Sequence, residues 1–119
     1  IQLHGNEDDL CIEEIKKKSG LPVIKAFRVA TAEDIKIAEK SPADYILLDN
    51  GAGGTGESFD WTLLNGIERE YFLAGGLNPE NVAEAVTRLR PWAVDVSSGV
   101  ETDRKKDYEK VLRFCRNAR

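Results

Sequence analysis

The sequence predicts an α/β fold in which short buried strands alternate with helices around one parallel sheet. The segment Tyr45–Asp49 is a continuous apolar run that ends in a carboxylate, which is typical of a strand buried on both faces. Residues 71–82 and 92–101 each pass from a short apolar run into small residues, as expected where a strand ends in a tight loop. Helical patterns separate these runs, and this repeat requires a parallel sheet with right-handed crossovers.

The first half of the chain contains two predicted strand–helix units. A strand at residues 1–4 precedes a helix pattern over residues 7–18, whose three final lysines suit the negative end of the helix dipole. The second strand is predicted at residues 23–29. Thr31 is suited to cap the next helix, and Asp34 completes a capping box in place of the usual Glu or Gln.

The second half of the chain continues the pattern from the strand at Tyr45–Asp49. Further strands are predicted at residues 71–74 and 92–96, and further helices at residues 59–64, 81–89 and 107–117. Asn78 and Pro79 carry the start signals of the middle one of these helices. In the last helix, the spacing of Tyr108, Val111, Leu112 and Cys115 predicts one apolar side.

Length and composition predict a single domain over residues 1–119. The chain is 41% hydrophobic and 32% charged, which is ordinary for a globular protein. Its formal net charge of −4 argues against a broad nucleic-acid footprint, and no apolar run approaches the roughly 20 residues that cross a bilayer. Cys11 and Cys115 form neither a metal-binding spacing nor a disulfide framework, so we expect both to pack in the core of a cytoplasmic protein.

Two loops rich in small residues are candidate phosphate sites. Gly75-Gly76 and Ser97-Ser98-Gly99 carry almost no side chain, so their backbone N–H groups can approach an oxyanion closely. In α/β barrels, two consecutive loops of this kind near the C-terminus form the phosphate site, often with a short extra helix. We therefore predict phosphate binding at these five residues.

Three further residues stand at the ends of predicted strands. Asp49 ends a buried strand, where barrel enzymes place catalytic groups, although it could instead cap the glycine-rich loop that follows. Arg28 ends the second strand and is a candidate substrate contact, with a surface ion pair as the alternative. His4 ends the first strand, as either a hydrogen-bonded structural residue or an active-site residue. The basic run at residues 104–106 is expected to be a solvated face.

About five strand–helix units are too few to close an eight-stranded barrel. They are compatible with an open doubly wound sheet, or with most of a barrel whose first units lie elsewhere. The local pattern does not choose between these two arrangements.

Six tracts of the chain resemble one known family. In order they are residues 1–5 (IQLHG), 47–49 (LLD), 53–56 (GGTG), 59–61 (FDW), 74–82 (AGGLNPENV) and 94–101 (VDVSSGVE). This ordered set resembles the phosphoribosylanthranilate isomerases. The resemblance implies a TIM (βα)₈ barrel with Ile1 on the family's fourth strand, so that this chain is a partial barrel of about five units.

The resemblance also implies a reaction. The family carries out an Amadori rearrangement in tryptophan biosynthesis, converting an anthranilate linked to ribose 5-phosphate into the carboxyphenylamino deoxyribulose phosphate. An acid protonates the furanose ring oxygen, and a base then removes the proton on the second carbon of the sugar. The iminium ion serves as the electron sink, so we expect no cofactor and no metal. The expected partner is the phosphorylated sugar–anthranilate substrate, without nucleic acid or membrane.

Residue by residue, the resemblance assigns Asp49 as the general acid and places His4 at a position that faces the active site. It makes the loop with Gly53, Gly54 and Thr55 a cover whose amides touch phosphate, with a plain flexible turn as the alternative. The family's cysteine base, and the arginine that holds the anthranilate carboxylate, match no residue here, and neither Cys11 nor Cys115 takes the place of the base. We therefore expect the isolated chain to be inactive.

Other functions remain open from the sequence. The chain could be a phosphate-binding fragment without turnover, or part of a different sugar-phosphate barrel enzyme, although residues 53–61 argue against the latter. Exposed sheet edges at the first and last strands would favour pairing with a second copy or with a complementing N-terminal fragment.

Overall fold

The sheet has five parallel strands, and they lie in the same order in space as in the sequence. The structure, a computed structural model, describes residues 1–49 and 60–119. The strands are β1 (Gln2–Leu3), β2 (Ile24–Arg28), β3 (Tyr45–Asp49), β4 (Tyr71–Leu73) and β5 (Ala93–Val94). A doubly wound sheet reverses its strand order near the middle, so this order excludes that alternative for the described strands.

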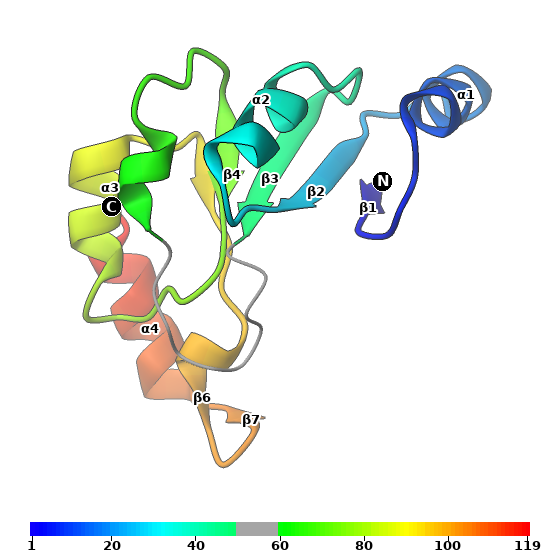
Figure 1. Cartoon of the computed structure of the whole chain (residues 1–119). Helices are drawn as coiled ribbons and strands as arrows, with labels where there is room; N and C mark the ends of the chain where they lie inside the picture. The colour runs from blue at the N-terminus through cyan, green and yellow to red at the C-terminus, as the bar shows by residue number, and fades with distance from the viewer. Residues whose placement is uncertain (50–59) are drawn as a thin grey trace.

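Four α-helices lie in the described part of the chain, and they follow the strands as the sequence predicts (Figure 1). They are α1 (Asp9–Ser19), α2 (Ala32–Glu39), α3 (Val82–Leu89) and α4 (Tyr108–Asn117). The short helix expected at residues 59–64 is the 3-10 turn η1 (Trp61–Leu64), and a second turn, η2 (Ser98–Val100), follows β5. A small antiparallel hairpin, β6 (Glu101–Thr102) and β7 (Lys105–Lys106), was not predicted.

The predicted helix starts at Thr31 and Asp107 are confirmed, and the capping side chains explain why. Thr31 Oγ1 accepts from the Asp34 amide, and the Asp34 carboxylate accepts from the Ala30 amide at 2.9 Å and the Thr31 amide at 3.0 Å. These backbone hydrogen bonds hold the pKa of Asp34 below its usual value. The Asp107 carboxylate accepts from the Lys110 amide in the same way.

All four helices pack against the same face of the sheet. Ile46 and Leu48 of β3 are fully buried on this face, in a cluster with side chains from α2, α3 and α4. The face continues to Val23, just before β2, where Ile12 of α1 and Ala43 complete a second cluster. Right-handed crossovers between parallel strands in sequential order place every helix on one side of the sheet.

The opposite face of the sheet carries a stack of aromatic rings. The ring centroids of Tyr45 and Trp92 are 5.0 Å apart, and the Phe72 ring lies 5.2 Å from Trp92 and 5.7 Å from Tyr45. Trp92 is 53% exposed, so this face is partly open to solvent. Tyr45 is the first residue of β3 and Trp92 directly precedes β5, so these two rings lie at the amino-terminal ends of their strands.

The predicted apolar side of α4 is wrong in its orientation. Tyr108, Val111 and Cys115 are exposed, and Phe114 is the buried residue of the helix. The physical reason is that contacts from elsewhere set the rotation of α4: Arg113 pairs with Glu80, and the Asn117 side chain donates to the Pro79 carbonyl at 2.7 Å. Cys115 therefore does not pack in the core, and Cys11 is only half-buried.

Candidate active site

The carboxyl ends of the parallel strands meet at one edge of the sheet, and the predicted site residues of the described chain gather there. His4 follows β1, Arg28 ends β2 and Asp49 ends β3. The loop at Gly75-Gly76 follows β4, and the loop at Ser97-Ser98-Gly99 follows β5. In Figure 1 the strand arrows point toward η2 and the hairpin, so this edge lies beside the last segments of the chain.

Asp49 has a firmly held backbone at this edge. Its carbonyl accepts from the Val29 amide at 2.7 Å, and the neighbouring Leu48 carbonyl accepts from the Ala74 amide at 2.9 Å. The strand is therefore fixed on both sides up to its last residue, and Asp49 is half-buried. Arg28 lies directly opposite Asp49 in the strand register, so both side chains stand on the same face. Arg28 itself is exposed, as is His4.

The loop after β4 has a backbone that only glycine adopts readily. Gly75 and Gly76 have φ of 91° and 69°, in the left-handed region. The Asn81 side chain clamps the loop, since its Nδ2 donates to the Gly76 carbonyl at 2.9 Å and its Oδ1 accepts from the Asn78 amide at 2.8 Å. Asn81 therefore positions the glycine loop. It was not among the predicted site residues, because its position in a predicted first turn gave no sign of this contact.

The predicted start of α3 lies too early. Asn78 does accept with its side chain from the amides of Glu80 and Asn81, both at 2.9 Å. These bonds close a separate turn, and α3 begins at Val82. The reason is that the Asn81 side chain is engaged with the glycine loop, which separates the turn from the helix.

The loop after β5 contacts the loop after β4 so closely that Gly99 has no room for a side chain. A Cβ atom at Gly99 would lie 1.8 Å from the Leu77 carbonyl oxygen. The small residues at 97–99 lead into η2, whose first amides, on Ser98 and Gly99, have no acceptor inside the turn. Amides of this kind suit an oxyanion, and the two loops form one continuous surface.

The hairpin β6/β7 borders the second loop. The Thr102 hydroxyl donates to the Asp107 carboxylate at 2.7 Å, and this bond, followed by the Lys110 amide, holds the pKa of Asp107 below its usual value. Lys106 reaches back from the hairpin to Ser97. Residues 104–106 are exposed, as expected of a solvated face, but the contact of Lys106 with the loop was not predicted.

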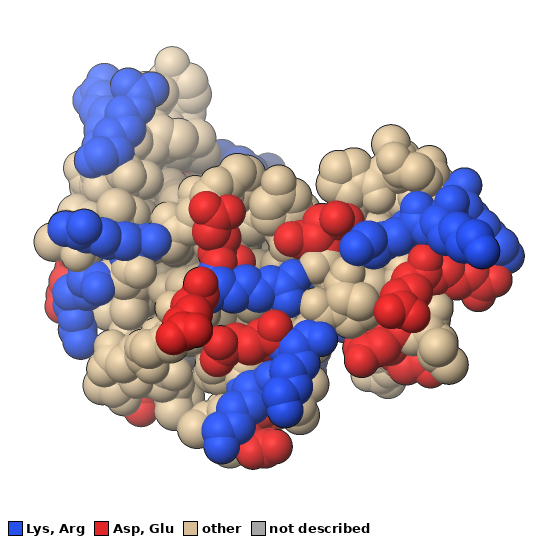
Figure 2. Space-filling model, turned by 90° about the horizontal axis from the view of Figure 1, so that it is seen from above, with Lys and Arg blue, Asp and Glu red and all other residues tan. Residues whose placement is uncertain are grey.

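Gly53, Gly54 and Thr55 lie outside the described residues, so their assignment to a phosphate cover stays a prediction. Within residues 1–49 and 60–119, no group of three His, Cys, Asp or Glu side chains could hold a metal ion. In the same residues, no helix is long and apolar enough to cross a membrane. On the face shown in Figure 2, basic and acidic side chains are interspersed.

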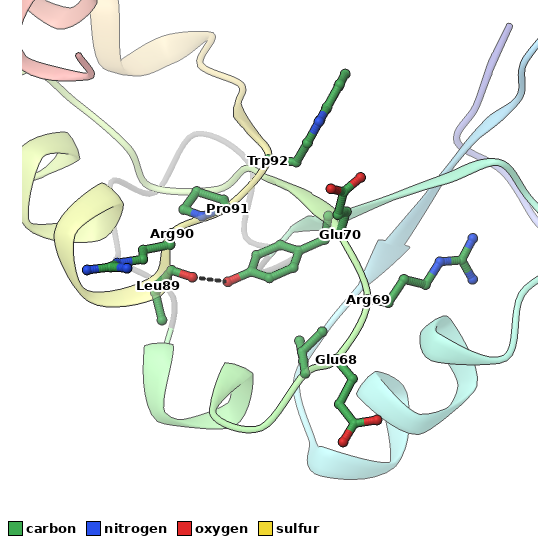
Figure 3. Close-up of a pocket in the computed structure, with 9 residues that line it drawn as sticks. Glu68, Arg69, Glu70, Leu89, Arg90, Pro91 and Trp92 are labelled. Atoms are coloured by element: carbon green, nitrogen blue, oxygen red, sulfur yellow. Dashed lines mark hydrogen bonds between the residues drawn. The ribbon is translucent and has the colours of Figure 1, made fainter.

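A hollow of about 420 Å³ lies at the opposite end of the sheet, where β4 and β5 begin (Figure 3). Arg69 on its wall donates to the carbonyls of Ser41 at 2.7 Å and Glu39 at 3.2 Å. The Tyr71 hydroxyl, whose pKa burial raises, lies 3.4 Å from the Leu89 carbonyl. These polar groups tie segments of the fold together at the stabilising end of the sheet, so the hollow is not the candidate site.

The sheet has sequential parallel strands, its helices lie on one face, and the candidate residues lie at the carboxyl ends of the strands. These features define a class: parallel α/β proteins whose functional groups lie where the strands end. The model of the N-(5'-phosphoribosyl)anthranilate (PRA) isomerase family matches residues 1–117, and the chain belongs to this family.

Relatives of known name agree with this membership. The N-(5'-phosphoribosyl)anthranilate isomerase of Endomicrobium trichonymphae is 45% identical, over 94% of this chain and 56% of its own length. A phosphoribosylanthranilate isomerase solved with reduced 1-(o-carboxyphenylamino)-1-deoxyribulose 5-phosphate superposes with a TM-score of 0.78 at 40% identity, over 98% of this chain and 57% of that one. The solved monomers that were generated from the dimeric phosphoribosylanthranilate isomerase of Thermotoga maritima superpose with a TM-score of 0.82 at 39% identity. The match covers 98% of this chain and 58% of that one. The chain thus spans less than two thirds of each relative.

Proposed function

We propose that this chain supplies the acid and the phosphate site of a phosphoribosylanthranilate isomerase. The reaction is the rearrangement of N-(5-phosphoribosyl)anthranilate to 1-(2-carboxyphenylamino)-1-deoxyribulose 5-phosphate. The observation that carries the proposal is the position of Asp49: it ends the buried strand β3, at the same edge as the two small-residue loops, in a chain that the family matches over residues 1–117.

The chemistry needs an acid and a base on the same sugar. Protonation of the furanose oxygen by Asp49 opens the ring to an iminium ion, which then makes the proton on the second carbon acidic. A positioned acid or base contributes about 10²–10⁴-fold to each proton step. The base and the contact to the anthranilate carboxylate come, in this proposal, from the part of the enzyme that this chain does not span. Arg28 and His4, exposed at the same edge, are the proposed further contacts to substrate.

The substrate phosphate binds, in this proposal, to backbone amides of Gly75, Gly76, Ser97, Ser98 and Gly99. Two features support this assignment: the left-handed backbone at Gly75 and Gly76, and the first amides of η2, which have no acceptor inside the turn. The loop with Gly53, Gly54 and Thr55 is proposed to cover the bound phosphate.

The exchange Gly76→Val is expected to weaken phosphate binding by about tenfold, since a φ of 69° costs an L side chain about 1–2 kcal/mol and the loop must move to relieve it. Titration with ribose 5-phosphate measures the change. Gly66→Val is the matched control, because Gly66 also has a positive φ, of 85°, and its Cβ would meet open space. Equal affinities in the two variants would contradict the assignment of Gly76.

The proposed architecture is a single domain, residues 1–119, that forms a partial (βα)₈ barrel. Sequential strands with all helices on one face support it, as do exposed apolar side chains on the first and last helices, Leu10 in α1 and Tyr108 in α4. In a closed barrel each outer helix has neighbours on both sides. The edges at β1 and β5 would then pair with complementing strands or with a second copy. A cytoplasmic location also remains a proposal.

Turnover of N-(5-phosphoribosyl)anthranilate tests the function. We expect the purified chain alone to be inactive, and activity to appear when the N-terminal part of a relative is added. Activity of the chain alone would show that the base lies within it or in a second copy. If neither the chain alone nor the mixture shows turnover, and circular dichroism confirms that the chain is folded, a phosphate-binding fragment without catalysis would be favoured.

A further inference from the structure

Lys106 contacts the second proposed phosphate loop, the one at residues 97–99, through Ser97. Its ammonium group donates to the Ser97 carbonyl at 2.9 Å and to the Ser97 hydroxyl at 3.2 Å. It also donates to Glu101 Oε2 at 2.5 Å. Three oxygen atoms from two residues therefore hold one cation at the entrance to the loop.

The hairpin that carries Lys106 is itself fixed to the body of the protein. Glu101 and Lys106 are direct partners across the antiparallel pair β6/β7, which brings their opposite charges together. Lys110 of α4 donates to the Glu101 carbonyl at 2.8 Å, and the Asp107 amide donates to the Val100 carbonyl at the same distance. Because both strands of the hairpin are held, the Lys106 side chain has a defined place from which to reach Ser97.

The contact bears on the part of the loop that presents its amides. The Ser97 carbonyl closes η2 by accepting from the Val100 amide, and this bond is long, at 3.4 Å. Lys106 is the nearer donor to the same carbonyl, at 2.9 Å. The direction of the Ser97 carbonyl sets the direction of the next amide, since both belong to one planar peptide unit. Lys106 therefore holds the peptide unit that carries the Ser98 amide from its carbonyl side.

We propose that Lys106 is a positioning residue of the phosphate loop: by holding the Ser97 carbonyl and hydroxyl, it keeps the Ser98 amide in place for a phosphate group. This inference rests on the proposed function, because that function supplies the phosphate. Lys105 carries the same charge one residue away, and successive residues of a strand point to opposite sides. A general charge effect therefore predicts equal roles for the two lysines, and a positioning role predicts unequal ones.

The experiment compares Lys106→Met, Lys105→Met and Lys106→Arg in this chain. Inorganic phosphate is titrated, and the amide resonances of Ser98 and Gly99 report binding. We expect Lys106→Met to raise the Kd roughly three- to fivefold, the scale of an exposed charge-assisted contact. Lys105→Met should leave the Kd nearly unchanged, and Lys106→Arg should restore most of the affinity. The urea midpoint of unfolding should be the same in all variants. A weaker phosphate affinity would then not be caused by loss of folding.

Equal weakening by both methionine variants, or none by Lys106→Met, would overturn the positioning role. If the wild-type chain shows no response to phosphate, the phosphate site in the proposed function is wrong. Hydrogen exchange of the Val100 amide, which donates to the Ser97 carbonyl, then decides on Lys106 in the absence of ligand. Faster exchange in Lys106→Met than in Lys105→Met would support its hold on the loop, and equal exchange would overturn it.

Discussion

Gly99→Ala is expected to lower the free energy of unfolding by about 3 kcal/mol, the upper end of the usual cost of overpacking. The added Cβ would lie 1.8 Å from the Leu77 carbonyl oxygen and 2.9 Å from its carbonyl carbon. A backbone carbonyl cannot rotate away as the end of a flexible side chain does, so the two loops must separate. Urea denaturation followed by circular dichroism measures the change.

The adjacent exchange Ser98→Ala is the control for Gly99→Ala. Ser98 is exposed, and its hydroxyl is the only group removed, so the free energy of unfolding should change by about 0.5 kcal/mol or less. If Gly99→Ala were as stable as Ser98→Ala, the close contact between the two loops would not exist in solution. If both loops bind the phosphate group, Gly99→Ala should also abolish phosphate binding at concentrations that saturate the wild-type chain.

The fold was predictable where local signals and tertiary packing agree. Strand Tyr45–Asp49 was predicted with the bounds it has, because a strand buried between two neighbours must be apolar throughout. The capping box of Thr31 and Asp34 was predicted because its hydrogen bonds are local. The orientation of α4 was not predicted from its apolar spacing. The contacts of Arg113 with Glu80 and of Asn117 with the Pro79 carbonyl set which side of the helix is buried, and both partners lie in a distant segment.

The candidate site also contains residues that local signals predicted and residues that they did not. Asp49 and the small-residue loops were found at strand ends, because residues that follow a buried strand emerge at one edge. Asn81 and Lys106 were missed, since each acts through a carbonyl in another segment, and a sequence pattern carries no sign of such a contact. The hairpin was missed too, because its turn residues Asp103 and Arg104, both at positive φ, lack the glycine that usually marks a turn of this kind.

Asp49→Asn is expected to lower turnover about 10²–10⁴-fold in the completed enzyme, formed by this chain and the N-terminal part of a relative. An amide has nearly the shape of the carboxylic acid but gives up no proton to the ring oxygen. Because the proposed phosphate contacts are backbone amides on other strands, affinity for ribose 5-phosphate should stay within about twofold. Single-turnover kinetics and a ribose 5-phosphate titration measure the two quantities separately.

Glu70→Gln makes the same chemical change at an exposed position just before β4, at the end of the sheet away from the site, and should leave turnover unchanged. A loss confined to Asp49→Asn would mean that the proton on this carboxyl group matters, since its shape is kept. Turnover near that of the unmodified enzyme would remove Asp49 from the acid role and would require the proton to come from another group. Loss of both turnover and phosphate affinity would mean that Asp49 holds the edge of the sheet together, because a group that only donates a proton has no part in binding phosphate.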